Sequence, residues 1–297
     1  MKPGDTIGIA ATARYLTHDQ WSFAEKTLLS WGLKIKTSSN LFHPEFQLAG
    51  NVIARTNSFI EMWEDPEVKA VLIARGGYGT IHTIDGLLPL LDGRKWVCGY
   101  SDVTVLLNAL NNIGVCSIHS TMPISFEHAT QEALQNLKEA LFGNLEVIQW
   151  NCNKLPNQTI QGEVVGGNLS VIYSQLGSAT QLKSKNKILF LEDVDEMYYH
   201  LDRMLMALLR AGVFGGVRAV LIGGFTQMKD NTEAFGFSSN NPWGKSWEDI
   251  ILERLSHLNV PIVFHFPAGH DNDNRAFYMG RQGNLNIQGE QAVLSWK

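Results

Sequence analysis

The first half of the chain alternates short apolar runs with longer amphipathic ones, and this alternation limits the possible folds more than any other feature of the sequence. Short runs rich in β-branched and apolar residues predict strands, and longer runs with apolar residues at helical spacing predict helices. A β-α-β-α order favours a parallel sheet with helices on both faces. We therefore expect an α/β, flavodoxin-like domain over residues 1–150. Its predicted strands are 6–11, 34–37, 70–74 and 96–99, and its predicted helices are 19–31, 51–63 and 105–113.

The second half has a different pattern, in which shorter β-like pieces are separated by helical ones. Residues 150–159 are polar and contain Asn, Lys and Pro, which predicts a linker. We expect a smaller, mixed α/β domain over residues 151–297, with a cleft between the two domains. Its predicted strands are 162–166, 187–192, 219–223, 261–264 and 292–296, and its predicted helices are 198–209 and 246–257.

Composition excludes several classes of protein. The 297 residues are 44% hydrophobic and 18% charged, which is typical of a globular protein. A net charge of -5 without any Lys/Arg run argues against a nucleic-acid partner, and no apolar stretch approaches the roughly 18 residues of a membrane span. The N-terminus has Pro, Gly and Asp where a signal peptide needs an apolar core, so we expect a cytoplasmic protein. The cysteines lack metal-ligand spacing and are expected to be reduced and structural: Cys98, Cys116 and Cys152.

A serine follows the predicted strand 96–99 at a point where nucleophilic enzymes place one. Gly99 ends the strand, Ser101 comes two residues later, and an amphipathic run begins at Val103. A serine on a sharp strand-to-helix turn exposes its hydroxyl, and the next N–H can stabilise the oxyanion that the serine creates. Serine is also a preferred helix N-cap, so Ser101 could instead only begin a helix.

A glycine loop, Arg-Gly-Gly-Tyr-Gly at 75–79, follows the strand predicted at 70–74. Consecutive glycines let backbone N–H groups converge on an anion or an oxyanion. The loop matches neither a dinucleotide-binding fingerprint nor a P-loop, and a tight turn without chemical function is the alternative. Ligands bind at the carboxyl ends of parallel strands, which is where both this loop and Ser101 are expected to lie.

The apolar run that starts at residue 187 ends in a cluster of acidic residues, Glu192, Asp193, Asp195 and Glu196. An apolar strand with a carboxylate at its tip suits an orienting partner for a histidine. The cluster could instead bind a divalent cation or cap the following helix. The cap interpretation suits Asp195 and Glu196, and it explains Glu192 less well because that residue directly follows the apolar run.

Two histidines lie near the strand predicted at 261–264. His270 follows a glycine in a flexible turn and is a candidate general base. His265 lies between two phenylalanines and is expected to be a packed strand residue. With Asp271 and Asp273 nearby a metal site is possible, although the zincin and EF-hand spacings are absent.

Ser101, Glu192 and His270 together form a serine, an acid and a histidine, each just past the end of a predicted strand. The α/β-hydrolases use this chain order. Their G-x-S-x-G motif is absent, because position 103 is Val. The spacing therefore predicts acyl-transfer hydrolysis without naming a substrate, and Glu196 is the alternative acid.

Eight motifs lie in order along nearly the whole chain: Lys-Pro-Gly-Asp-Thr-Ile-Gly-Ile at 2–9, the loop 75–79, Gly-Tyr-Ser-Asp-Val-Thr at 99–104, His-Ser-Thr-Met-Pro at 119–123, Gly-Gly-Asn-Leu-Ser at 166–170, Leu-Phe-Leu-Glu-Asp at 189–193, Asp-Arg-Met-Leu at 202–205 and Pro-Ala-Gly-His at 267–270. Together they resemble the LD-carboxypeptidase family of serine peptidases, also called muramoyl-tetrapeptide carboxypeptidases, which includes the microcin-immunity peptidases. The resemblance implies a triad. Ser101 would attack the carbonyl before a C-terminal D-amino acid, His270 would carry the proton to the leaving amine, and Glu192 would orient the imidazole.

The resemblance also implies an oxyanion hole formed by the N–H groups of Asp102 and Gly77, and a substrate contact from Asn168. The family fold implies an N-terminal parallel-sheet domain and a smaller domain that supplies the acid and the histidine, so the active site would assemble across the cleft. It implies a homodimer, a muropeptide substrate, and neither a cofactor nor a metal.

The chain departs from the family pattern in three places. Residues 11–14, Ala-Thr-Ala-Arg, replace a Pro-Ser pair after the first strand. The loop 271–275 is more polar than the Gly-rich family version, and residues 225–247 add a segment rich in Asn, Gly and aromatic residues. These differences concern the substrate rather than the chemistry.

The function expected first is removal of D-Ala from cytosolic murein tetrapeptides during peptidoglycan recycling. An alternative is an immunity-type amidase that hydrolyses peptide–nucleotide antibiotics, in which Trp243 or Trp247 would stack on a base. A third hypothesis is a cleft without catalytic activity that binds small anions at the glycine loop. The presence of all three triad residue types disfavours this third function.

Overall fold

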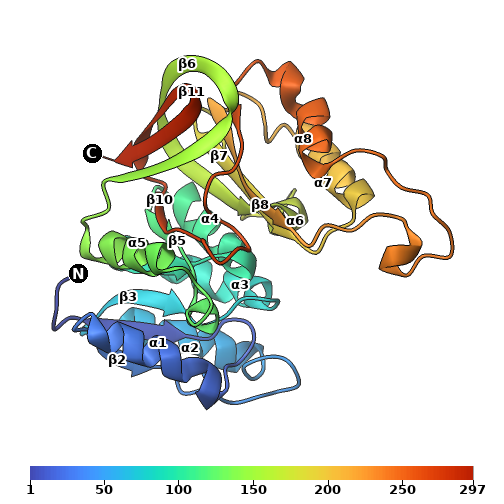
Figure 1. Cartoon of the computed structure of the whole chain (residues 1–297). Helices are drawn as coiled ribbons and strands as arrows, with labels where there is room; N and C mark the ends of the chain where they lie inside the picture. Colours follow the sequence, from blue (N-terminus) through green and yellow to red (C-terminus); the bar gives the residue numbers. More distant parts are fainter. Residues whose placement is uncertain (297) are drawn as a thin grey trace. The chain divides into compact units, whose positions relative to one another are not determined.

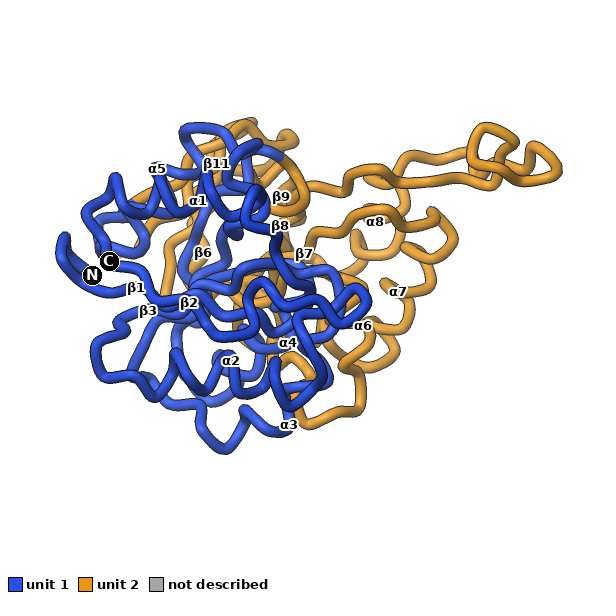
Figure 2. The backbone as a smooth tube through the Cα atoms, turned by 90° about the horizontal axis from the view of Figure 1, so that it is seen from below, with its two compact units in different colours: residues 1–146, 272–281 blue, residues 147–271, 282–297 orange. Residues whose placement is uncertain are grey.

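The computed structural model describes residues 1–296, and the chain forms two compact α/β units, drawn in different colours in Figure 2. The first unit combines Met1–Glu146 with Asn272–Arg281, and the second combines Val147–Asp271 with Gln282–Lys297. A division at residue 150 does not anticipate the return of 272–281 to the first unit. The expected fold class, two mixed α/β units with mostly parallel sheets, is confirmed.

A six-stranded sheet forms the centre of the first unit (Figure 1). Its strands are β1 (Thr6–Ala10), β2 (Lys34–Thr37), β3 (Val68–Ile73), β4 (Trp96–Gly99), β5 (Ser117–His119) and β10 (Phe277–Met279). They lie in the order β10-β5-β4-β3-β1-β2, all parallel except that β10 is antiparallel to β5. Every residue of β1 is buried, as in strands that helices cover on both faces. The carboxyl ends of the parallel strands therefore meet at one edge of the sheet.

The helices of this unit begin where the sequence supplies caps. Thr17 and Gln20 form a capping box, and Asn51 and Thr130 each accept a backbone N–H from the first turn of their helices. The last helix ends at Gly143 in the left-handed conformation. The helices are α1 (His18–Ser30), α2 (Val52–Glu64), α3 (Ile84–Leu87), α4 (Thr104–Asn112) and α5 (Gln131–Phe142).

The second unit contains a five-stranded sheet with helices packed against it. Its strands are β6 (Val147–Asn168), β7 (Ile188–Val194), β8 (Ala219–Thr226), β9 (Ile262–Val263) and β11 (Gln282–Trp296), in the order β11-β6-β7-β8-β9. β11 is antiparallel to β6, and the other pairs are parallel. The apolar core includes residues of all three helices, α6 (Leu169–Ser174), α7 (Tyr198–Arg210) and α8 (Trp247–Leu255).

The prediction of a linker at 150–159 is wrong, because these residues lie inside the long strand β6. Ile148, Trp150 and Cys152 are buried, and the polar residues between them face outward. This alternation is the period-2 pattern of a half-buried strand, which the high polar content of the segment obscures. Antiparallel pairing with β11 completes the ladder.

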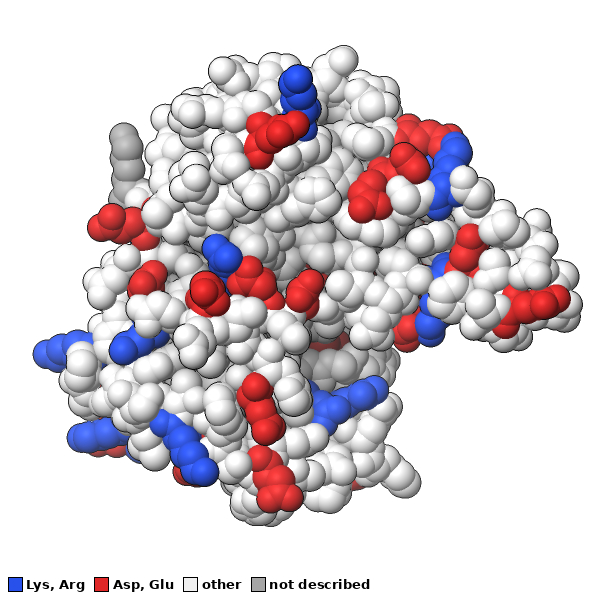
Figure 3. Space-filling view, in the orientation of Figure 1, with Lys and Arg blue, Asp and Glu red and all other residues white. Residues whose placement is uncertain are grey.

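Charged side chains are mixed over the surface shown in Figure 3, where no broad patch of one sign gathers. This agrees with the small net charge of -5. Among the helices described for residues 1–296, none combines the length and the apolar character needed to cross a bilayer.

We predict that a methyl group at Gly166 destabilises the second unit far more than a methyl group at Gly177. Both residues have positive φ, 127° and 79°, where alanine is strained. A Cβ at Gly166 would lie 2.0 Å from the carbonyl oxygen of Phe190 in β7, whereas a Cβ at Gly177 would meet nothing within 4 Å. Gly166→Ala should lower the free energy of unfolding by about 3 kcal/mol or more, and Gly177→Ala by about 1 kcal/mol. Urea unfolding followed by circular dichroism measures both, and equal losses would contradict the close strand contact.

Candidate active site

Ser101 lies in a tight turn that connects β4 to α4. Its φ of 62° is in the left-handed region, and residues Ser101–Val103 form a 3-10 turn before the helix. A serine is uncommon in this region, which nucleophile elbows use to expose the hydroxyl. The N-cap of α4 is Val103, and no side chain caps that helix. The geometry therefore favours the elbow over the alternative that Ser101 only begins a helix.

The glycine loop lies directly against this turn. A Cβ on Gly76 would be 3.3 Å from the Ser101 Cβ and 3.5 Å from the Asp102 nitrogen, so the close approach leaves little room for a side chain. Asp102 is buried, and its Oδ2 accepts a hydrogen bond from the Thr80 N–H at 2.9 Å. Gly77 is exposed and has a φ of 102°. The turn and the loop are thus held together within the first unit.

A buried arginine, Arg55 of α2, holds the glycine loop through its backbone. Its Nη1 donates to the carbonyl oxygens of Gly79 at 2.5 Å and Thr12 at 2.9 Å, and its Nε donates to that of Gly50 at 3.2 Å. Burial lowers the pKa of Arg55. Sequence reasoning missed this residue, although its position one helical turn before the buried Phe59 places it on the apolar face of α2.

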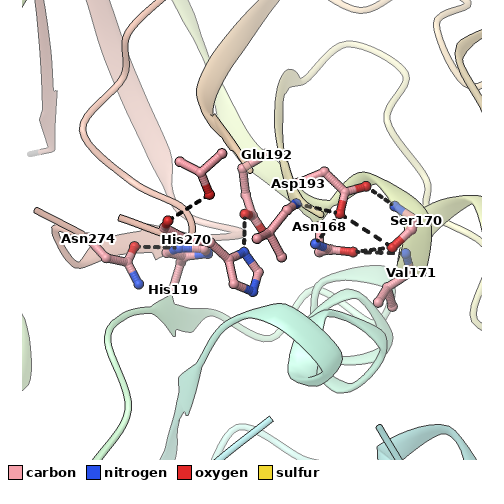
Figure 4. Close-up of polar contacts among 10 residues, drawn as sticks. His119, Asn168, Ser170, Val171, Glu192, Asp193, His270 and Asn274 are labelled. Carbon is pink, nitrogen blue, oxygen red and sulfur yellow. Dashed lines mark hydrogen bonds and ion pairs between the residues drawn. The ribbon is translucent and has the colours of Figure 1, made fainter. Parts of the chain in front are cut away.

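In the second unit, Glu192 and His270 form a hydrogen-bonded dyad (Figure 4). The His270 Nδ1 lies 2.7 Å from the Glu192 Oε2. The Glu192 side chain is fully buried, and 18% of the His270 side chain is exposed. The β7–β8 register shifts between Leu191 and Asp193, so pairing is irregular at Glu192. Such irregularities redirect side chains near functional sites.

Gly269 makes the contact between these two residues possible. A Cβ at this position would lie 3.0 Å from the Glu192 Cβ and 3.1 Å from its Oε2. The φ of Gly269 is 125°, and its backbone bridges to Gly224 at the end of β8. A glycine before the histidine therefore leaves the room in which the carboxylate reaches the imidazole.

The environment of His270 raises its pKa. Burial lowers the pKa of the imidazole, but the charge of Glu192 and the hydrogen bond to it outweigh burial, with a smaller contribution from Asp193. The dyad therefore stabilises the imidazolium that forms when His270 takes up a proton. A histidine that holds a proton well in this way suits transfer between an attacking hydroxyl and a leaving amine.

Asp193 anchors Asn168 beside the dyad, a role that the sequence analysis did not assign to it. The Asn168 Nδ2 donates to the Asp193 Oδ1 at 2.9 Å, and the Asn168 Oδ1 accepts the Val171 N–H at 3.1 Å as the N-cap of α6. The second Asp193 oxygen accepts the Ser170 N–H at 2.9 Å. Burial, and then the charge of Glu192, raise the pKa of Asp193 to about 7. Asn168 is thus held rigidly at the strand position that pairs with Glu192.

The helix-cap interpretation of Asp195 and Glu196 is wrong. The N-cap of α7 is Met197, and no side-chain hydrogen bond caps this helix. Asp195 instead forms an ion pair with Lys229 at 2.5 Å, and the Glu196 Oε2 lies 2.5 Å from the His200 Nδ1. Glu192, rather than Glu196, is the residue that bonds His270.

His265 is also not the packed strand residue expected. β9 ends at Val263, and His265 is exposed in a left-handed turn with a φ of 62°. Both flanking phenylalanines are buried, which turns the residue between them outward. Over residues 1–296 no group of three or more His, Cys, Asp or Glu side chains could hold a metal ion.

The two tryptophans of the added segment differ in their surroundings. Trp247 begins α8 and stacks on Phe225, with ring centroids 5.2 Å apart, so it is a packing residue. Trp243 is 37% exposed in the long loop between β8 and α8. Its backbone N–H donates to Asp230.

Comparison with known proteins shows which family this chain belongs to. The N-terminal domain model of the LD-carboxypeptidases matches residues 7–120, and the C-terminal domain model matches residues 161–285. The chain is 32% identical to the Synechocystis sp. carboxypeptidase homologue slr1534 over 100% of its own length and 95% of that protein. The chain belongs to the LD-carboxypeptidase family. It is therefore a member of a family of serine-type peptidases.

Other similar proteins have more specific names. The chain is 30% identical to the murein tetrapeptide carboxypeptidase of Pseudomonas aeruginosa, over 80% of its length and 79% of that protein. The crystal structure of muramoyltetrapeptide carboxypeptidase from Oxalobacter formigenes matches with a TM-score of 0.85 and 25% identity, covering 97% of each chain. The microcin C7 self-immunity protein MccF of Escherichia coli is 24% identical over 90% of this chain and 86% of its own length.

The structure places the expected site residues of this chain in two groups, each held by contacts within its own unit. The group in the first unit follows β3 and β4, and the group in the second unit lies at the ends of β6, β7 and β8. The first group is Gly77, Ser101 and Asp102, and the second is Asn168, Glu192 and His270.

We predict that Glu192→Gln lowers the pKa of His270 and that Glu196→Gln leaves it unchanged. Glutamine keeps the size of the side chain but removes the charge that opposes the effect of burial on the imidazole. NMR titration of the His270 ring, assigned by comparison with His270→Gln, measures the change. A wild-type pKa in Glu192→Gln, or an equal decrease in Glu196→Gln, would contradict the assignment of Glu192 as the partner.

Proposed function

We propose that this protein is a serine carboxypeptidase that cleaves the bond before a C-terminal D-Ala in murein tetrapeptides. The observation that carries the proposal is the buried hydrogen bond from His270 to Glu192. The left-handed turn at Ser101 supports it, because acyl-transfer enzymes place their nucleophile on such a turn. The name of the Pseudomonas relative supports the substrate class.

In the acylation step, the Ser101 Oγ attacks the carbonyl carbon of the residue before D-Ala. His270 Nε2 takes the hydroxyl proton, because the hydrogen bond to Glu192 places the other ring proton on Nδ1. The new C–O bond pushes an electron pair onto the carbonyl oxygen, and the N–H groups of Asp102 and Gly77 stabilise that oxyanion. Collapse of the intermediate breaks the C–N bond, and the imidazolium gives its proton to the departing D-Ala amine.

In the deacylation step, water replaces the amine. His270 takes a proton from the water as the oxygen attacks the acyl carbon, and the same N–H groups stabilise the second oxyanion. Collapse breaks the bond to Ser101, which regains its proton from His270 and releases the tripeptide. Neither step uses a metal ion or a cofactor.

The proposal also covers a substrate contact, the cellular compartment and the oligomeric state. Asn168, held by Asp193, would contact the peptide. The enzyme would act in the cytoplasm on peptides recovered from the cell wall, and its free thiols suit a reducing compartment. It would form a homodimer, as family members commonly do.

Incubation with a murein tetrapeptide tests the nucleophile. Wild-type protein should release tripeptide and D-Ala, and Ser101→Ala should lower kcat by at least about 10⁴-fold because the triad acts as a unit. Ser22→Ala, an exposed serine in α1, is the matched control and should retain wild-type activity. Mass spectrometry of both products measures the rates.

Activity of Ser101→Ala at the wild-type level would overturn the nucleophile. Absence of D-Ala release by the wild-type protein would overturn the substrate. In that case, the protein is tested on a peptide–nucleotide amide. Hydrolysis of this amide, with inhibition of the reaction by an adenylate analogue, would identify the immunity-type activity instead.

A further inference from the structure

Two arginines, Arg14 and Arg75, lie beside the nucleophile turn in the first unit. Arg14 ends the segment 11–14 in which the sequence departs from the family pattern, and Arg75 opens the glycine loop. They follow β1 and β3, which are adjacent parallel strands paired up to Ala10 and Ile73. Their side chains therefore start from the same edge of the sheet as the turn after β4.

Arg14 packs on the backbone of the glycine loop. A Cβ at Gly77 would lie 2.8 Å from both the Cδ and the Nε of Arg14 and 3.2 Å from its Cζ, so the side chain covers the face of this glycine. The neighbouring Gly76 has the same kind of contact with Ser101, at 3.3 Å from the Ser101 Cβ. Ser101 thus packs against Gly76, and the Arg14 guanidinium packs against the next residue, Gly77.

Neither arginine forms an ion pair with a carboxylate of the described residues. Within residues 1–296, the Arg14 Nε is buried without a hydrogen-bond partner, and Arg75 donates to the Tyr15 carbonyl oxygen at 3.4 Å. Burial, and then the charge of Arg14, lower the pKa of Arg75. Two partly desolvated like charges near each other are unfavourable unless an anion joins them.

Arg55 provides an internal comparison. Its guanidinium donates to three backbone carbonyls, of Thr12, Gly50 and Gly79, which is the pattern of an arginine that supports structure. Arg14 and Arg75 lack such a set of acceptors within the described part of the chain. Their N–H groups suit a planar acceptor supplied from outside the protein.

We propose that Arg14 and Arg75 bind the C-terminal carboxylate of the peptide substrate, an inference that rests on the proposed carboxypeptidase function. In such a substrate the carboxylate carbon is only three bonds from the scissile carbonyl carbon. The two carbons are therefore at most roughly 3.8 Å apart, and a guanidinium that binds the carboxylate lies one hydrogen bond, about 2.9 Å from nitrogen to oxygen, beyond it. Such a cation must start close to the nucleophile turn. The guanidinium fork matches a carboxylate with two parallel hydrogen bonds. This pair would make the enzyme require a free C-terminus and would exclude cleavage within a longer chain.

The test compares a murein tetrapeptide with its C-terminal amide, which keeps the scissile bond but removes the charge. The wild-type protein should prefer the free acid. Arg14→Gln and Arg75→Gln should each lower kcat/KM for the acid by about 10- to 100-fold and change kcat/KM for the amide by less than about threefold. Arg210→Gln, an exposed arginine at the end of α7, is the matched control and should not change the ratio.

Equal losses on acid and amide would show that the arginines only support the fold of the loop, and unchanged rates on the acid would show that they do not bind it. Either result overturns the proposal while leaving the carboxypeptidase function in place. If the wild-type protein releases no D-Ala, titration calorimetry measures binding of N-acetyl-D-alanine and of its amide, and this tests the carboxylate site without requiring catalysis. Acid-specific binding that both glutamine variants lose would support the carboxylate site, and equal affinity or no binding would overturn it.

Discussion

The buried carboxylate of Glu192 is the group on which the rest of the second unit depends. A carboxylate removed from water costs several kcal/mol unless hydrogen bonds and an opposite charge compensate for it. His270 supplies both, at 2.7 Å, and this requires the backbone to come unusually close. Gly269 leaves the room for the contact, and Gly166 lets β6 approach β7 at Phe190. A change at either glycine would therefore act on the chemistry through the backbone, without touching the reacting groups.

In the first unit, too, the backbone positions the site residues. The carboxyl ends of parallel strands meet at one edge, so residues distant in sequence come together there. Ser101 follows β4, the glycine loop follows β3, and Arg14 follows β1. Arg55 then holds the loop through backbone carbonyls, which leaves the exposed Gly77 in a fixed conformation. Each unit thus prepares its part of the proposed triad by internal contacts alone.

Much of this arrangement could be predicted from the sequence. Strand segments that are buried on both faces, such as residues 7–10 of β1 and 70–73 of β3, are continuous apolar runs, and the elements around Ser101 follow directly from them. The linker prediction failed at β6, where outward-facing Asn and Gln residues conceal a half-buried strand that depends on pairing with the distant β11.

Interactions between polar side chains were the least predictable part. Asp195 and Glu196 have the local pattern of helix caps, but Asp195 pairs instead with the distant Lys229, and Glu196 pairs with His200, four residues further along the chain. Arg55 and Asp193 act through carbonyl and amide groups brought together only by the fold. A pattern of residue types along one chain carries little signal for such contacts, apart from the i,i+4 spacing of Glu196 and His200 and the apolar face on which Arg55 lies.

Labelling with a serine-reactive fluorophosphonate tests most directly whether Ser101 is activated by His270. Intact mass should show one adduct per chain, and peptide mapping should place it on Ser101, with labelling at least about 10³-fold slower in His270→Ala because the general base is gone. An adduct on another residue, no adduct, or equal labelling in His270→Ala would contradict the account.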